Sequence, residues 1–531
     1  MATVELNVNA GEPVRVKEPA AKTAGALTHK AYLNAFATLL DLSVKGLVMT
    51  VVTPLLVGFL GGPLYGVWQV IAKLVTYMQA ADGRPTQALK WVIANRREVD
   101  DDATKRKHVG SAFGVWLLFL PVMFLMGAGL VWAAPHVAGV APEMQGTVRV
   151  AAALLVVGFL LGQLVLLPEA VLRGMNLGYK RMGLQAGLSV VGGALSVGAL
   201  YAGGGLEGLA AAEVALVALT GALFLAVVRR YVPWFGLARP SFKEVRSFLK
   251  LSVWYFAWTF VHRFILASDV VILAALASAS AVADYTLTGF AAVTLLGFVT
   301  TAIGAATPGL GGVVGLKQFE RAVALRAEMM TLSWLLLAVA GSTIIAWNRS
   351  FVHLWVGAEH YAGFWPNLLA VLMTVQLIFI RNDSYVIDLT LQLREKVLTG
   401  AASAVVSVGL AAALTPRYGI AGLCLGMMAG RAVLTLVYPF IVNSQLGLPR
   451  VPRLAGALRP GATMALMFTA AALLGRAVLA GSWLGWLASV AATFAAALLV
   501  ALFVGLRADA RRALFKRLTL LRSLPAARGR L

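Results

Sequence analysis

The chain has 531 residues, of which 60% are hydrophobic and only 13% are charged. A water-soluble chain is about one quarter charged, so this composition excludes a globular protein with a water-facing surface on all sides. The net charge of +22 could suit a nucleic-acid partner, but the positions of the charges, described below, argue against one.

The apolar residues come in blocks of about twenty, the length that a helix needs to cross a bilayer. Long runs of Leu, Val and Ala without alternation predict helices and not a β-barrel, because a spanning backbone must satisfy its own hydrogen bonds. We therefore predict an all-α polytopic membrane protein with about 14 transmembrane helices. The predicted spans are 34–60, 64–80, 109–134, 147–172, 179–202, 206–228, 250–276, 282–306, 328–347, 364–388, 396–415, 420–442, 459–479 and 483–506.

The lysines and arginines between the spans give an independent test of this topology. If the N-terminus is placed inside, the basic loop residues fall almost entirely on the inner side, as the positive-inside rule requires. The exceptions are Arg149, Arg349, Arg417 and Arg476. A wrongly added or omitted span would reverse every later loop, so we predict an even number of spans and two cytoplasmic ends.

The segments around the spans define the expected domains. The N-terminal segment is polar and charged without an apolar core, so we expect no cleavable signal peptide. The C-terminal segment places leucines against arginines at helical spacing, which favours an interfacial helix on anionic lipid. The predicted domains are a cytoplasmic tail (1–33), an N-lobe (34–228), a cytoplasmic linker (229–249), a C-lobe (250–442), two added helices (459–506) and a basic tail (507–531).

An internal repeat supports two lobes of six helices. Residues 177–181 and 205–209 resemble residues 393–396 and 419–423, and each pair encloses one apolar span. The copies are six helices apart, and because six is even they point the same way through the membrane. The repeat therefore predicts two lobes related by an axis along the membrane normal.

Charges inside the spans are the candidate functional residues, because a charge at mid-bilayer costs about 2.5–3.5 kcal/mol on insertion scales. Lys45, Lys73 and Arg263 lie well inside their spans, and such cations meeting between lobes would make a positive cavity that suits an anion, above all a phosphate. Structural pairing is the competing interpretation. Asp269 could bind a coupling cation or pair with a basic residue of another helix, and Asp41 could pair with Lys45 one turn away.

Other polar features have simpler explanations. We expect structural pairing or snorkelling for Glu169, Arg381, Asp383 and Asp388, which lie toward the inner ends of their spans. Three tryptophans around the loop after the ninth span are predicted to be membrane-interface anchors, namely Trp347, Trp355 and Trp365.

The sequence lacks the motifs that would indicate an enzyme. The single cysteine, Cys424, lies in an apolar block and offers no disulfide or metal-ligand spacing. The Gly-rich stretch at 309–315 lacks the Gly-Lys-Ser/Thr ending of a phosphate loop. We therefore predict no catalytic residue, no metal and no cofactor.

Short motifs resemble the polysaccharide-transporter, or Wzx-like, branch of the MOP flippase superfamily, which also holds lipid II flippases and MATE exporters. The motifs run in order through both halves of the chain: TPLL at 53–56, FLG at 59–61, YGVW at 65–68, PGL at 308–310, LWVG at 354–357 and RYGIAG at 417–422. The sequence departs from the family pattern at 84–86, which bears on how the second span ends.

The resemblance implies two six-helix lobes in a MATE-like V, with a C-terminal helix pair added. It implies a bacterial inner-membrane flippase that moves an isoprenoid-diphosphate-linked oligosaccharide to the outer leaflet by alternating access, for a surface polysaccharide. On this interpretation Lys45, Lys73 and Arg263 would line the cavity. Its partners would be the glycan lipid, membrane lipids, a coupling Na⁺ or H⁺, and the polysaccharide polymerase machinery.

Three alternatives remain open at this stage. A MATE-type exporter of drugs or metabolites should favour acidic cavity residues, whereas the deep charges here are mostly basic. A membrane glycosyltransferase should carry carboxylates in sizeable outer loops, whereas these loops are short. A lipid II flippase would differ only in its substrate.

Overall fold

The protein is all-α across the residues that the computed structural model describes. These are residues 21–83, 85–96, 100–175, 177, 179–246, 248–249, 268–304, 310–311, 313–314, 316–390, 394–448 and 458–512. The helices are α1 (Ala21–Tyr77), α2 (Pro85–Arg96), α3 (Asp102–Ala138), α4 (Gln145–Gly174), α5 (Tyr179–Tyr201), α6 (Gly205–Tyr231), α8 (Ala279–Gly304), α10 (Phe319–Trp355), α11 (Phe364–Thr390), α12 (Arg394–Gln445), α13 (Leu458–Ala477) and α14 (Trp483–Val500). Short 3₁₀ turns are η1 (Met78–Ala80), η2 (Pro142–Met144) and η3 (Ala358–His360), and a π-turn, η5 (Ala501–Gly505), follows α14.

The longest helices, α1 and α12, each contain two passes. Non-helical backbone at Gly61 interrupts α1, and the same occurs at Gly419 in α12. Tyr65 is hydrogen-bonded to Thr53, although a straight helix would place these residues about 18 Å apart. Gly61 has a φ of 73° and Gly419 a φ of 55°, values that favour glycine. Each chain segment therefore turns back on itself at its glycine.

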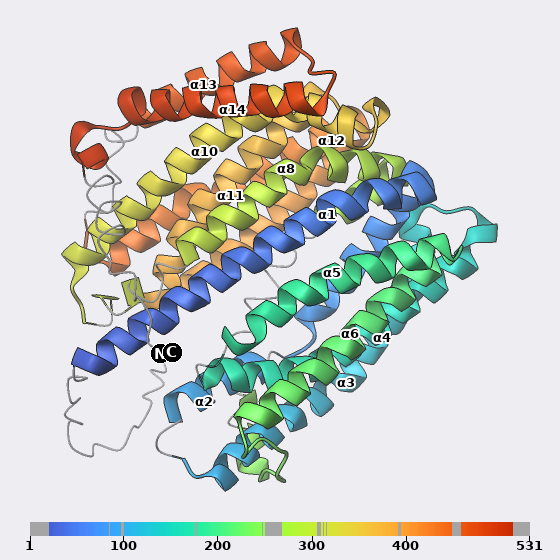
Figure 1. The fold of residues 1–531 in the computed structure, drawn as a ribbon, viewed down its shortest axis with the longest axis vertical. Coiled ribbons are helices and arrows are strands. Elements are labelled where there is room, and N and C mark those ends of the chain that lie inside the picture. Colours follow the sequence, from blue (N-terminus) through green and yellow to red (C-terminus); the bar gives the residue numbers. More distant parts are fainter. Residues whose placement is uncertain are drawn as a thin grey trace.

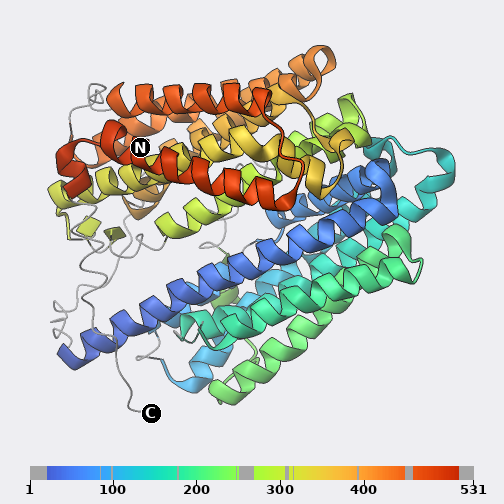
Figure 2. The same ribbon diagram turned by 45° about the horizontal axis from the view of Figure 1, so that its top comes forward.

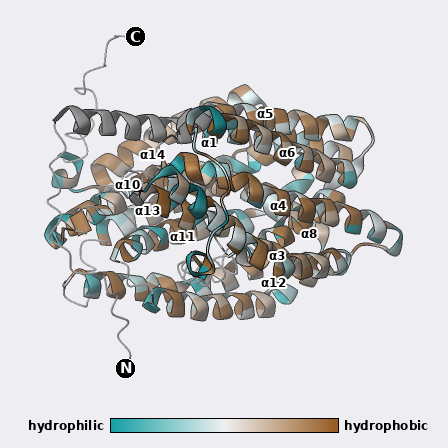
Figure 3. Cartoon of the chain, turned by 90° about the horizontal axis from the view of Figure 1, so that it is seen from below, coloured by the Kyte–Doolittle hydropathy of each residue, from teal (hydrophilic) through white to brown (hydrophobic). Residues whose placement is uncertain are grey.

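The span prediction agrees with these helices. Eleven helices in the described part of the chain are long and apolar enough to cross a membrane. Since α1 and α12 each hold two passes, this fits the predicted topology, and the predicted span at 250–276 lies mostly outside the described residues. Figure 3 shows hydrophobic residues along the length of the helices.

Two elements differ from the sequence prediction. A separate helix, α2, begins at Pro85 after a turn at Gly83, because proline fits the first turn of a helix. This is where the sequence departs from the family pattern. The second difference is α10, which has 37 residues and extends well beyond the predicted span 328–347 at both ends.

The helices form two packed groups, seen in Figures 1 and 2. In the N-terminal lobe, α1 packs on α5, α6 packs on α4 and α5, and α3 packs on α4. In the C-terminal lobe, α11 packs on α8, α10 and α12. The pair α13 and α14 packs against α10. The contact between α1 and α8 joins the two lobes, and we call this boundary the seam.

The two lobes share apolar clusters at one end of the molecule. We call this the hairpin end, because the tight turns at Gly61, Gly203 and Gly419 lie there. One cluster joins residues 67–74 of α1 to residues 270–282 and 423–427, and another joins Val52 and Leu56 to Leu287 and Trp355. Clusters toward the opposite end belong to one lobe only. The seam is therefore closed at the hairpin end.

Two of the predicted tryptophan anchors are structural instead. Trp347 and Trp355 are buried, and their indole N–H groups donate to Thr493 Oγ1 (2.8 Å) and to the carbonyl of Thr50 (2.6 Å). Trp365 is exposed, as an interface anchor should be. The prediction was wrong for the first two because the long α10 carries them into helix contacts.

Candidate functional site

An ion pair joins the two lobes across the seam. Lys73 lies in the second half of α1, and Asp269 lies in the segment 268–278 that precedes α8. Lys73 Nζ is 3.9 Å from Asp269 Oδ1. The lysine side chain keeps 34% of its surface exposed, against 13% for the aspartate. The pair is therefore loose, and its cation remains accessible to another anion.

The Asp269 carboxylate is held in place by its own lobe. Tyr285, on α8, donates its hydroxyl to Asp269 Oδ2 at 2.9 Å. The backbone N–H of Val270 donates to Oδ1, also at 2.9 Å. A second contact across the seam lies alongside, where the Tyr77 hydroxyl donates to Ser268 Oγ at 3.2 Å. Asp269 is thus a fixed acceptor that faces Lys73.

A second cation approaches the same carboxylate from α12. Arg431 is only 1% exposed, and its charge interacts with Asp269 and with Tyr285. Cys424 lies about two turns before Arg431 on the same face of α12, where it is buried and interacts with the charge of Asp269. Lys73 and Arg431 together outweigh the single carboxylate, so the described cluster has a positive balance.

The other predicted site residues lie elsewhere or outside the described residues. Lys45 is on the exposed face of the first half of α1, where its charge interacts with Glu213 of α6. Asp41 is half-buried on the same helix. Arg263 lies outside the described residues. The structure therefore brings Lys73 and Asp269 together and places Lys45 with a carboxylate of its own lobe.

Several other membrane charges form pairs within one lobe. Arg326 binds Asp383 through Nε (2.7 Å) and Nη2 (2.6 Å), and Arg173 binds Glu169 one turn away at 2.6 Å. Lys396, fully buried, pairs with Asp388. These pairs agree with the structural interpretation of Glu169, Asp383 and Asp388.

Sequence reasoning did not select Tyr285 and Arg431 as site residues. Arg431 carried a usable signal, because a charge in the middle of an apolar span needs a reason. Tyr285 carried none, since a tyrosine inside a span is common. Among the residues that the structure describes, no group of His, Cys, Asp or Glu could hold a metal ion.

An apolar cavity lies in the C-terminal lobe, apart from the charged cluster. It has a volume of about 350 Å³ and lies between α8, α10 and α14. Phe290, Phe298 and Trp486 are among its lining residues. The lining hydroxyls of Thr294 and Thr343 donate to carbonyls of their own helices, at 2.8 and 2.9 Å. The cavity can therefore accept an apolar chain without leaving these groups unsatisfied.

A family model gives the first comparison with known proteins. The model described as polysaccharide biosynthesis protein matches residues 32–311, more than half of the chain. No curated protein matches the sequence.

Solved structures match the fold at low sequence identity. The lipid II flippase MurJ, in an inward closed conformation, has a TM-score of 0.68 at 11% identity, and the match covers 93% of this chain and 100% of MurJ. An inward-facing multidrug resistance MATE family transporter of the MOP superfamily has a TM-score of 0.59 at 15% identity, covering 77% and 98%. A MOP superfamily transporter from Pyrococcus furiosus has a TM-score of 0.54 at 14% identity, covering 79% and 95%. The chain therefore has the MOP transporter fold, as the resemblance implied.

Proposed function

The chain belongs to the polysaccharide biosynthesis protein family, and from this premise we propose that it is a flippase for an isoprenoid-diphosphate-linked oligosaccharide. The substrate would pass from the inner to the outer leaflet by alternating access, in which the seam between the lobes closes at one end and opens at the other. No covalent bond of the substrate changes in this process.

The observation that carries this proposal is the ion pair between Lys73 and Asp269. A diphosphate offers several anionic oxygens, and ammonium and guanidinium groups bind such oxygens by charge-assisted hydrogen bonds. Lys73 is loosely paired and partly exposed, so a diphosphate can replace Asp269 as its partner. Arg431 adds a second positive charge beside the same carboxylate. Because the pair crosses the seam, such a replacement would also alter the contact between the lobes.

The lipid part of the substrate needs an apolar environment while the sugar crosses. The cavity between α8, α10 and α14 offers one, because its rings and aliphatic side chains line a volume of about 350 Å³. We propose that part of the isoprenoid chain can occupy it, with the remainder in the bilayer.

The test is export of cell-surface polysaccharide by variants of the candidate cations. We expect Lys73→Ala to reduce export strongly, and Lys45→Ala and Arg263→Ala to reduce it if they also line the path. Arg173→Ala is the matched control, since Arg173 pairs with Glu169 within one helix. Unchanged export in all three cation variants would overturn the proposed substrate contact.

The lipid II flippase remains the second candidate, because the fold match to MurJ covers 93% of the chain. Both substrates share an isoprenoid diphosphate, so the cavity chemistry does not separate them. Deletion of the gene would separate them: loss of surface polysaccharide with normal peptidoglycan supports the first, and arrest of peptidoglycan synthesis supports the second. An exporter of cationic drugs fits less well, because Lys73 and Arg431 outnumber Asp269 in the described cluster.

We also propose that the protein lies in a bacterial inner membrane with both termini in the cytoplasm. The distribution of basic loop residues supports this orientation. It predicts that a cysteine placed at Glu143, in the exposed turn η2 of the hairpin end, reacts with an impermeant reagent added outside intact cells.

A further inference from the structure

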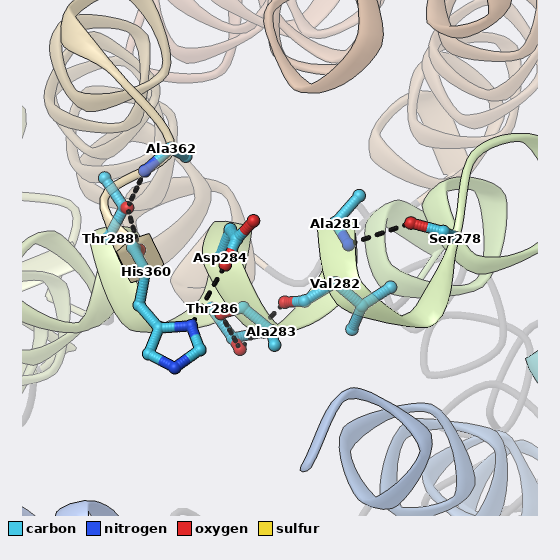
Figure 4. Close-up of polar contacts among 9 residues, drawn as sticks. All are labelled: Ser278, Ala281, Val282, Ala283, Asp284, Thr286, Thr288, His360 and Ala362. Atoms are coloured by element: carbon cyan, nitrogen blue, oxygen red, sulfur yellow. Dashed lines mark hydrogen bonds and ion pairs between the residues drawn. The ribbon is translucent and has the colours of Figure 1, made fainter. Parts of the chain in front are cut away.

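The turn between α10 and α11 is fixed to α8 at the hairpin end of the seam. Thr288 of α8 accepts a hydrogen bond from the backbone N–H of Ala362 (2.8 Å) and donates to the carbonyl of His360 (3.3 Å). Asn348 of α10 donates to the carbonyl of Thr288 (2.8 Å). Figure 4 shows Thr288 linked to Ala362 and to His360, with the His360 ring reaching to Asp284. These hydrogen bonds fix the turn to the C-terminal lobe.

The His360 side chain reaches from this turn to the other lobe. Its Nδ1 lies 3.2 Å from Asp284 Oδ1 on α8. Its ring lies against Gly62 of α1, so closely that a Cβ on Gly62 would be 2.7 Å from His360 Cε1. A Cβ at position 62 would force the ring to shift. His360 is thus held by α8 on one side and covers the backbone of α1 on the other.

The surroundings of this contact lie within the seam. Trp355, at the end of α10, donates to the carbonyl of Thr50 in α1 at 2.6 Å. A Cβ on Gly66 of α1 would lie 1.8 Å from the carbonyl oxygen of Ala279, which begins α8. The two lobes thus touch backbone to backbone beside the histidine.

We propose that His360 is a latch residue that holds the hairpin end of the seam closed, and that Asp284 positions its ring. The hairpin end cannot open while the ring covers Gly62, so each opening must break this contact. The Asp284–His360 contact lies within one lobe and is kept during opening. This inference goes beyond the proposed substrate, since it concerns what opens and not what is carried.

The charges near the ring favour this role. Asp284 of α8 and Glu359 of the same turn are the acidic groups, and their charges interact. Tyr361, next in the chain, is a neutral phenol whose pKa is raised by burial to about 12, and it interacts with the charge of Arg349 of α10. From α1 the contact is the backbone of Gly62. An imidazole that donates to Asp284 fits between these groups without an opposing charge.

The test measures how readily the seam opens at this end, with no substrate present. Cys424 is replaced by alanine, and Val57, a buried seam residue of α1, is replaced by cysteine as the reporter. In a separate protein, labelling of Glu143→Cys identifies the membrane face on which the hairpin end lies. A membrane-impermeant maleimide is then added from that face. The rate of labelling at position 57 then reports opening of the hairpin end.

We expect His360→Ala to raise the labelling rate, roughly fourfold if the lost packing of the ring on Gly62 is worth about one buried methylene group. Gly62→Ala should raise the rate similarly, because the added Cβ displaces the ring, and adding it to His360→Ala should give little further increase. Asp284→Ala should raise the rate, whereas Asp284→Asn keeps an acceptor oxygen and should restore the slow rate.

His353→Ala is the matched control, because His353 is an exposed histidine on α10 near the same end. The latch is refuted if His360→Ala labels no faster than His353→Ala. It is also refuted if the fold increase in labelling rate of the double variant equals the product of the increases of His360→Ala and Gly62→Ala. Failure of Asp284→Asn to restore the slow rate would refute the positioning role. None of these results depends on polysaccharide export, so the latch and the proposed substrate can fail separately.

Discussion

Two of the ion pairs in this protein differ in the distance between their charged groups and in their exposure to solvent. Within the C-terminal lobe, Arg326 contacts Asp383 Oδ1 by a hydrogen bond from Nε (2.7 Å) and an ion-pair contact from Nη2 (2.6 Å), and the aspartate is only 6% exposed. Across the seam, Lys73 lies 3.9 Å from Asp269 and keeps 34% of its side-chain surface exposed. The first geometry fixes helices that stay together. The second leaves a cation that can change partners when the lobes move or when an anion arrives.

The largest expected effect is on the pair within the C-terminal lobe. Asp383→Ala should lower the free energy of unfolding in detergent by about 3 kcal/mol, the lower end for a buried pair, because it removes the buried carboxylate that pairs with the half-buried Arg326. Thermal unfolding monitored by tryptophan fluorescence would measure this. The double variant Arg326→Met with Asp383→Leu should recover most of the loss, since apolar replacement of both partners removes the unpaired charge. A double variant as unstable as the single one would show that the pair is not the cause.

Removal of the tyrosine that holds Asp269 should have an intermediate effect. Tyr285→Phe deletes a hydroxyl that donates to the carboxylate at 2.9 Å, and hydrogen bonds to charged groups contribute about 1.5–3 kcal/mol. We expect a loss of stability in this range, measured in the same assay, together with reduced export. Unchanged stability would mean that Asp269 finds another donor.

The seam pair itself should contribute little to stability. Lys73→Ala should change the free energy of unfolding by less than about 1 kcal/mol, because a partly exposed pair of this length gains little from its Coulomb attraction. Export should nevertheless fall strongly. Exchange of the two residues, Lys73→Asp with Asp269→Lys, sharpens the comparison: it keeps the pair but moves the cation to the other lobe. Full export by the exchanged protein would contradict substrate contact at Lys73.

The smallest effect is expected for the partly exposed pair within α4. Arg173→Ala removes a partner of Glu169 that lies one helical turn away, and such pairs contribute about 0.3–0.5 kcal/mol. A large loss of stability in this variant would contradict the order of effects expected here for the ion pairs.

Sequence reasoning selected only part of the candidate site. It selected Lys73 and Asp269 separately, because each is a charge within an apolar span, but it could not rank a partner for Asp269. It expected Trp347 and Trp355 at the membrane interface, whereas both are buried between helices. It did not select His360. The pairing of Asp269 with Lys73 and the side-chain contacts of His360 depend on residues more than seventy positions away in the chain. The burial of the two tryptophans depends on the length of α10.

The sequence by itself determined the class of protein, the succession of spans and the turning points. Apolar length and the need to satisfy backbone hydrogen bonds predict helices. The gaps between the predicted spans at 61–63 and 416–419 include the glycines at which α1 and α12 turn back. Only the tertiary structure decided which charges meet and which end of the seam is closed. Those contacts join helices through side-chain packing in three dimensions. The spacing of residues along one helix does not indicate which helix packs beside it.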